Sequence, residues 1–229
     1  MDPDSGSGVL PSIDRAAGAM KIFPLPGVVV LPGSAVPFHV FEPRYRLMVA
    51  DALAGDRILC VGTLRNDADA MQDRAAVHPV AGAGFLEEAE RQPDGRYHVL
   101  FRCLERVRLV RELENGKPYR EFAVERLEDL YPPAGAAALQ GEAEALRQLT
   151  LELCQVLPEE SGAARLAETA ARTRDPSALA DLVAGAVAEE VPARLAVLGT
   201  ADVGQRLSRV MQELSGVLLL LSQGRAPRA

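Results

Sequence analysis

The chain has 229 residues, 48% of them apolar, and it carries a formal net charge of −7 with a pI near 5.1. This length has room for one domain or two small ones, and the apolar content is sufficient for a core. The acidic balance argues against nucleic-acid binding, which needs clustered Lys and Arg, and Lys occurs only at Lys21 and Lys117.

The termini and the cysteines point to a soluble protein of a reducing compartment. Residues 1–19 are rich in Gly, Ser, Pro and Asp, lack the segments of a signal peptide, and are predicted to form a flexible tail. The late apolar run 217–221 is too short to span a membrane. Cys60, Cys103 and Cys154 are odd in number and far apart, which favours buried thiols over disulfides. We therefore predict a cytoplasmic protein without a membrane partner, cofactor or metal.

Residues 22–48 are the most informative stretch, because prolines punctuate an apolar sequence at short intervals. Proline removes a backbone donor and fixes φ, so it does not suit the middle of a central strand. The short apolar runs between the prolines predict strands at 22–23, 28–31 and 35–38, with Gly33 in a turn. Glu42-Pro43 predicts a helix start, because Pro is tolerated in the first helical turn.

This stretch resembles the start of the Lon protease N-terminal, or LON substrate-binding, domain, which opens with "PLFPLPGVVLFPG" followed by "HIFEPRYRQM". The corresponding residues here run from Phe23 to Gly33 and from His39 to Met48. The resemblance implies structural or substrate-binding roles for Pro24, Pro26, Gly27, Pro32, Gly33, Phe41, Glu42, Pro43, Arg44 and Tyr45.

The next hundred residues read as short strands separated by turns. An apolar strand is predicted at 57–64, a polar mobile loop at 66–74, and a strand with a bulge at 77–86, where Gly82 and Gly84 occur. Pro93-Asp94-Gly95 and Asn115-Gly116 are hairpin signals. This spacing favours a small barrel or sandwich, and the resemblance implies a PUA-like pseudobarrel over residues 20–131. Cys103 stands where the family usually has Gly, which bears on the bulge geometry.

After a linker at 131–135 the apolar period changes to that of helices. We predict one helix ending at Pro158, one at 163–172, and one capped by Asp175-Pro176. A short helix from Pro192 and a long one capped by Thr200 and ended by Gly224 complete a bundle over residues 136–224. The predicted fold class is therefore α+β, a PUA-like β pseudobarrel followed by a C-terminal helical bundle.

Catalytic patterns are missing from the sequence. Gly116-Lys117 precedes Pro118 instead of opening a phosphate-binding helix, and neither Lys suits a Ser-Lys pair. His39, His78 and His98 are scattered and are interpreted as solvated or hydrogen-bonded side chains, not metal ligands. Arginines at 102, 106, 108 and 111 are interpreted as a surface ladder paired with Glu105, Glu112 and Glu121. We predict no catalytic residue and no enzyme.

The leading hypothesis is a non-catalytic binding module that resembles the Lon substrate-recognition domain. It would bind unfolded or damaged protein segments for proteolysis, in a groove between barrel and bundle or along a strand edge, with a Lon-type ATPase as a further partner. The alternatives are an RNA-binding PUA-like domain and a ligand-sensing module of the cereblon type. Homo-oligomerisation through the apolar helix at 207–221 also stays open.

Overall fold

The computed structural model describes residues 12–69, 72 and 74–223. The strands are β1 Met20–Leu25, β2 Ala35–Val40, β3 Ile58–Leu64, β4 Val77–Arg91, β5 Tyr97–Leu113 and β6 Glu121–Arg126. The helices are α1 Pro43–Leu53, α2 Gln140–Val156, α3 Ala163–Arg172, α4 Pro176–Val187, α5 Val191–Leu198 and α6 Val203–Ser222. Short 3-10 turns occupy Ile13–Arg15, Asp67–Asp69, Gly135–Leu139 and Glu159–Ser161. The α+β fold class is confirmed.

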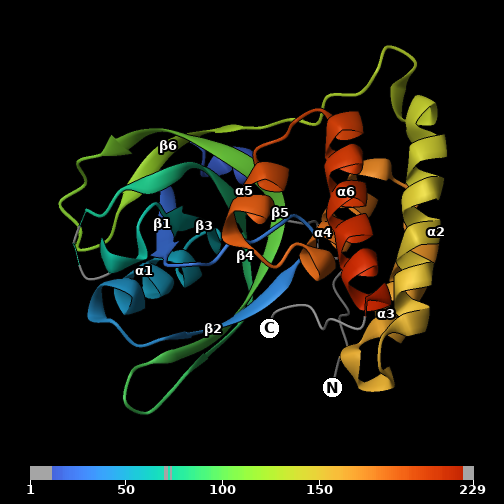
Figure 1. Ribbon diagram of the computed structural model, residues 1–229. Coiled ribbons are helices and arrows are strands. Elements are labelled where there is room, and N and C mark those ends of the chain that lie inside the picture. The colour runs from blue at the N-terminus through green and yellow to red at the C-terminus, as the bar shows by residue number, and fades with distance from the viewer. Residues whose placement is uncertain (1–11, 70–71, 73, 224–229) are drawn as a thin grey trace, which may run out of the picture.

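The six strands form one mixed sheet, and the helices after β6 gather on one side of it (Figure 1). The strand order is β2-β5-β4-β3-β1-β6, and β5 also pairs with β6. All seven residues of β3 are buried, because β3 lies between β4 and β1. The PUA-like pseudobarrel and the domain limits 20–131 and 136–224 stay predictions.

The prolines of β1 and β2 lie at positions where the sheet does not need a hydrogen bond from a backbone N–H. Pro24 lies in the part of β1 that pairs with β3, while the β1–β6 register covers only Met20 and Lys21. Pro37 lies in β2, whose sheet partner is β5. Helix α1 begins at Pro43, as predicted, and buries Tyr45 against Phe23, with ring centroids 4.9 Å apart.

Gly82 and Gly84 of β4 allow a close backbone approach and a bulge in the long β4–β5 hairpin, as the sequence indicated. A Cβ added to Gly84 would lie 1.9 Å from the carbonyl oxygen of Arg102 on β5, so only Gly fits. The register shifts between Ala83 and Gly84. Opposite this bulge Cys103 is fully buried, and burial raises the pKa of its thiol. The Cys at a position where Gly was expected is therefore accommodated in the core.

The strand predicted at 28–31 is wrong, because these residues form an irregular segment outside the sheet, between the turns at Pro26-Gly27 and Pro32-Gly33. Its side chains alternate all the same. Val29 and Leu31 enter the core of the helical bundle, whereas Val30 enters the core beneath the sheet. A Cβ on Gly82 would lie 2.3 Å from the carbonyl oxygen of Val30, so this segment can cross β4 as closely as it does only because residue 82 is Gly. The segment therefore contributes to both cores.

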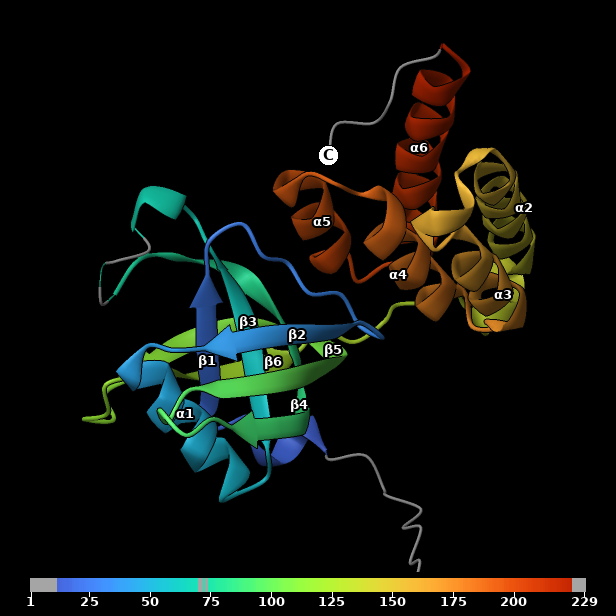
Figure 2. The ribbon, with the colours of Figure 1, turned by 90° about the horizontal axis from the view of Figure 1, so that it is seen from below.

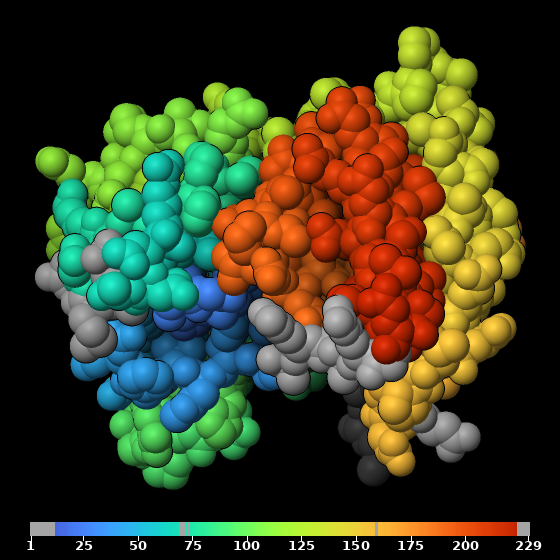
Figure 3. Space-filling model, viewed as in Figure 1, coloured from blue at the N-terminus to red at the C-terminus, as the bar shows by residue number. Residues whose placement is uncertain are grey.

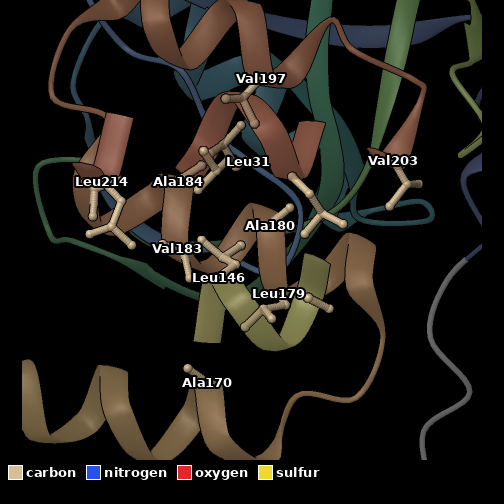
Figure 4. Close-up of a cluster of buried hydrophobic side chains, with 14 of the residues drawn as sticks. Leu31, Leu146, Ala170, Leu179, Ala180, Val183, Ala184, Val197, Val203 and Leu214 are labelled. Carbon is tan, nitrogen blue, oxygen red and sulfur yellow. The ribbon is translucent and has the colours of Figure 1, made fainter. Parts of the chain in front are cut away.

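The helices bury a core of aliphatic side chains from all parts of the bundle, and Leu31 lies among them (Figure 4). Helix α4 is the central element, with Leu179, Ala180, Val183 and Ala184 fully buried. The predicted cap at Asp175 is confirmed, since its carboxylate accepts from the Ala178 N–H at 2.8 Å.

The cap predicted for the last helix was misplaced. Asp202, not Thr200, caps α6 by accepting from the Gln205 N–H at 2.8 Å, while the Thr200 hydroxyl donates to the Ala196 carbonyl. A carboxylate two residues further on outcompetes the hydroxyl because it is the stronger acceptor. The predicted end at Gly224 lies outside the described residues.

Other predictions concern the ends and loops. Ile13 is only 2% exposed and packs against the sheet, so the packed part of the chain begins before residue 20. Part of the predicted loop at 66–74 lies outside the described residues, as do residues 1–11 of the predicted tail. Across the described parts of the chain, every helix is too short or too polar to cross a membrane. The cytoplasmic location stays a prediction.

Candidate binding groove and the ion-pair network beneath it

A groove with a volume of about 600 Å³ lies between the start of β2 and the helices α3 and α4. Figure 2 shows the start of β2 beside α4 and α3, although these segments are far apart in the sequence. Figure 3 shows the sheet half, coloured blue to green, packed directly against the helical half. The groove is therefore a feature of the joint between the two halves.

The walls of the groove are mostly apolar and small, with hydroxyl groups between them. The apolar wall residues are Pro32, Ala35, Leu166, Ala178, Leu182 and Ala186, the hydroxyl residues are Ser34, Thr169, Thr173 and Ser177, and the charged residues Arg165 and Asp175 also line the groove. Small side chains leave room for the side chains of a ligand, and hydroxyls can bond to a peptide backbone. These walls can hold an extended apolar segment without demanding one sequence.

The charged side chains at the groove floor form a buried ion-pair network. Arg106 of β5 donates from Nη2 to both carboxylate oxygens of Asp181 in α4, at 2.7 and 2.6 Å. Its Nη1 donates to Asp129, in the segment after β6, at 2.5 Å. Since Arg106 and Asp181 are only 4% and 2% exposed, this pair is shielded from solvent. It joins the sheet directly to the bundle.

A second arginine completes the network from the other side. Arg206 of α6 is fully buried and donates from Nη2 to Asp129 at 2.7 Å and to the Ser177 hydroxyl at 2.8 Å. Ser177 in turn donates to Asp129. Two guanidinium groups thus face two carboxylates, and the network holds together β5, the linker, α4 and α6.

The network is balanced in charge but not in hydrogen bonds. Arg106 Nε, Arg206 Nε and Arg206 Nη1 have no hydrogen-bond partner among the described residues, although Arg206 Nε lies 3.8 Å from Asp181. Burial raises the pKa of the Asp181 carboxyl to about 7, against the opposing effect of the Arg106 guanidinium. Removing ions from water costs several kcal/mol each. The network therefore fixes the geometry of the joint more than it adds net stability.

The structure separates the ten residues that the sequence singled out. Pro32 and Gly33 line the groove, because they form the turn that leads into β2. Pro26 and Gly27 form the turn after β1, where the Gly27 N–H donates to Asp67 at 3.1 Å. Phe41 is 60% exposed, between β2 and α1. Pro24 lies in β1 and Tyr45 in the core, so both support the fold.

Glu42, Pro43 and Arg44 line a second, polar pocket of about 600 Å³ near the β5–β6 turn. Arg44 pairs with Glu42 at 2.9 Å and stacks over the Tyr45 ring at 4.6 Å. The other cations of this pocket are also paired, Arg120 with Glu112 at 2.8 Å and Lys117 with Glu121 at 3.1 Å. Arg74 also lines the pocket and lies 4.0 Å from Glu112, so each of the four cations has a carboxylate partner. This pairing favours a structural role for the helix start.

The sequence analysis missed the network and placed Arg106 on the surface. The surface ladder is wrong for Arg106, and the glutamates predicted to pair with it have other partners, Glu105 with Arg126, Glu112 with Arg120 and Glu121 with Lys117. Arg102 pairs instead with Glu87, at 2.7 Å, on the partly exposed face. Arg106 is buried because the bundle covers this end of β5. One signal was available, since Asp181 stands alone as a charge within the otherwise apolar helix PSALADLVAGAV. A charge there predicts a buried partner.

The structure defines a class, an α+β protein in which a six-stranded mixed sheet joins a helical half, with a groove at the joint. The model of the ATP-dependent protease La (LON) substrate-binding domain matches residues 19–216, and the chain belongs to this family. The predicted resemblance is therefore confirmed over most of the chain.

Solved structures and curated relatives agree with this family. The N-terminal domain of Mycobacterium avium complex Lon protease has a TM-score of 0.66 at 19% identity, over 86% of this chain and 98% of that one. The Lon N-terminal domain protein from Xanthomonas campestris has a TM-score of 0.56 at 18% identity, over 85% and 97%. These likenesses show the fold.

Among relatives, Lon protease 2 of Myxococcus xanthus is 26% identical over 86% of this chain and 23% of its own length. Lon protease 1 of Thermus thermophilus is 29% identical over 84% and 24%. The chain thus spans about a quarter of the length of the curated relatives it matches.

Proposed function

We propose that this chain is a non-catalytic recognition module that binds unfolded or damaged protein segments in the groove between β2, α3 and α4. The observation that carries the proposal is the groove itself, with small apolar walls, interspersed hydroxyls and a rigid charged floor. Apolar surface drives binding in proportion to the area buried. A groove with few demanding polar contacts tolerates many sequences, at the expense of affinity.

The role in proteolysis follows from the family and extends the proposal to a partner. The family is described as a substrate-binding domain of an ATP-dependent protease, and the curated relatives, of which this chain spans about a quarter, are Lon proteases. We therefore propose that a Lon-type ATPase receives the bound segment. The chain contributes recognition, and its partner contributes unfolding and cleavage.

Fluorescence anisotropy with a labelled, permanently unfolded protein, such as reduced and carboxymethylated lactalbumin, tests the binding role. Wild-type protein is expected to bind this probe and to ignore the native, disulfide-bonded form. The variant Ala186→Arg places a long side chain in the groove from an exposed position of α4, and binding should fall severalfold.

A matched variant separates the groove from general surface effects. Ala171→Arg makes the same change at an exposed position of α3 that does not line the groove, and it should bind like the wild type. Equal loss in both variants, or no binding of the unfolded probe by folded wild-type protein, contradicts the proposal.

A further inference from the structure

Two of the three histidines, far apart in the sequence, stand directly opposite each other on neighbouring strands. His39 of β2 pairs in register with His98 of β5, and their ring centroids are 4.9 Å apart. The Cys103 N–H donates to the Ser34 carbonyl at 2.9 Å, five residues from each histidine. Because hydrogen bonding alternates along an antiparallel pair, His39 and His98 occupy a non-hydrogen-bonded position, where side chains approach most closely.

Carboxylates complete the surroundings of this pair. His98 is in register with Glu90 of β4, so the three side chains form one row across three strands. All three are exposed on the same face of the sheet. They line a shallow hollow of about 660 Å³ together with Glu88, and none of the lining residues is Lys or Arg. The hollow thus combines two imidazoles with two unneutralised carboxylates.

We propose that His39 and His98 chelate a divalent late transition-metal ion, such as Zn²⁺ or Ni²⁺, with Glu90 as an oxygen ligand. Imidazole favours these ions over Mg²⁺ and Ca²⁺, which prefer oxygen ligands alone. Metal–nitrogen distances of about 2.0–2.1 Å require the two ligating nitrogens to lie within about 4 Å. Rings with centroids 4.9 Å apart reach this separation by turning about their side-chain bonds.

The site is a two-histidine chelate that the carboxylate completes on binding. Within the described residues, no three His, Cys, Asp or Glu side chains already surround a common point. Glu90 is exposed and free to choose another rotamer, so it can swing toward the ion. The strand β2 pairs with β5 through backbone hydrogen bonds, and the ion would add a link between the side chains of the two strands.

The thiols offer little competition for the metal. Burial raises the pKa of the Cys60 thiol to about 12 and also raises the pKa of Cys103 and Cys154. Metal binds the thiolate, which these environments disfavour. His78, the remaining histidine, lies at the start of β4 and does not line the hollow. It provides an internal control.

Isothermal titration of the full chain with NiCl₂ and ZnCl₂, in the presence of a non-chelating reductant, tests the site. One ion should bind per chain, whereas MgCl₂ should give no binding heat. His39→Ala and His98→Ala should each weaken binding by about tenfold or more, because even groups that only support a metal ligand contribute 10–100-fold. His78→Ala should leave affinity unchanged, and Glu90→Gln should weaken it by a smaller factor.

A measurement on unmodified protein guards against variants that fold poorly. In nitrogen-15 NMR spectra, the ring signals of His39 and His98 should shift or broaden on addition of Zn²⁺, while those of His78 should not. Absence of binding at about 1 mM metal overturns the proposal, because a dissociation constant of about 1 mM is already weak binding. So does a loss in His78→Ala equal to that in His98→Ala, or a shift confined to His78. None of these outcomes depends on client binding in the groove.

Discussion

The sheet and the helices are joined in two regions that use opposite chemistry. In the first region, the apolar segment 28–31 sends Val29 and Leu31 into the bundle and Val30 toward the sheet. In the second region, the ion-pair network of Arg106, Asp181 and their neighbours spans the same joint beneath the groove. Val29, Val30 and Leu31 are buried in the first region, and Arg106, Asp181 and Arg206 in the second, where Asp129 is 27% exposed.

The difference teaches what each kind of joint can do. Apolar contacts are non-directional, so the segment stabilises the joint in proportion to buried area and tolerates changes of similar volume. Ion pairs demand orientation and both partners, so the network fixes one relative placement of β5, α4 and α6. The groove depends on that placement, because its walls come from both halves.

The largest effect is expected from breaking the network on one side. Arg206→Met removes a guanidinium that is fully buried and leaves the carboxylates undercompensated, which should lower the free energy of unfolding by about 3–5 kcal/mol. Urea denaturation measures this loss. Arg102→Met, which breaks a partly exposed pair with Glu87, should cost about 1 kcal/mol or less.

A combined replacement sharpens the same point. Adding Arg106→Met and Asp181→Leu to Arg206→Met replaces the three most deeply buried charges by apolar groups, which is often neutral or stabilising. Asp129 stays charged without its two arginines, but it is 27% exposed and can be hydrated. Most of the lost stability should return, whereas client binding should not, because the groove floor has changed. A triple variant less stable than Arg206→Met would show that the network adds net stability.

The apolar joint should show the next largest effect. Leu31 is 2% exposed within the bundle core, and Leu31→Ala should lower the free energy of unfolding by about 2–5 kcal/mol through lost transfer energy and a cavity. Leu31→Met, which conserves volume, should cost less than about 1.5 kcal/mol. Equal losses in the two variants would mean that shape, not buried volume, governs this joint.

A smaller effect is expected where the segment crosses β4. Gly82→Ala would place a Cβ 2.3 Å from the Val30 carbonyl oxygen, so the backbone must move, at a cost of about 1–3 kcal/mol. The control is Gly216→Ala in α6, which has open space around it and should stabilise by about 0.5–1 kcal/mol. Thermal denaturation distinguishes the opposite signs. Gly82→Ala as stable as the wild type would refute the close crossing.

The last effect concerns pH, and it is the smallest when the change in unfolding free energy is counted per pH unit. The pKa of Asp181 is raised in the folded state from 3.8 to about 7, chiefly by burial. The folded protein therefore binds this proton more tightly than the unfolded chain, and the contribution to stability is lost as pH rises from about 4 through 7. The slope is at most about 1.4 kcal/mol per pH unit for one proton.

Comparison of the wild type with Asp181→Asn isolates that slope from the other carboxylates. The difference in unfolding free energy between the two proteins, followed from pH 4 to 8 by urea denaturation, should shift in favour of the Asn variant as pH rises. A shift in favour of the wild type would mean that the arginines outweigh burial and lower the pKa of Asp181.

Local sequence rules were sufficient wherever neighbours in the chain determine the outcome. Pro43 at the start of α1, the cap at Asp175 and the hairpin turn at Gly95 depend on interactions within a few residues, and all three were predicted. Glycines at 82 and 84 also signalled close backbone approach. The apolar character of 28–31 could be predicted from the sequence. That this segment does not pair with a strand could not, because pairing depends on which segments lie alongside it in the fold.

The tertiary structure alone decided which charges became buried and which side chains met. Arg106 and Arg102 look alike in the sequence, yet one lies under the bundle and the other on a partly exposed face. His39 and His98 meet because β2 pairs with β5 in one register, a long-range choice that depends on the whole core. The sequence by itself determined the family, the cap of α4 at Asp175 and the positions of the glycines that allow close backbone contact, since these depend on residues that the sequence shows directly. The groove, its ionic floor and the histidine pair come from contacts between distant segments, whose energies no local pattern encodes.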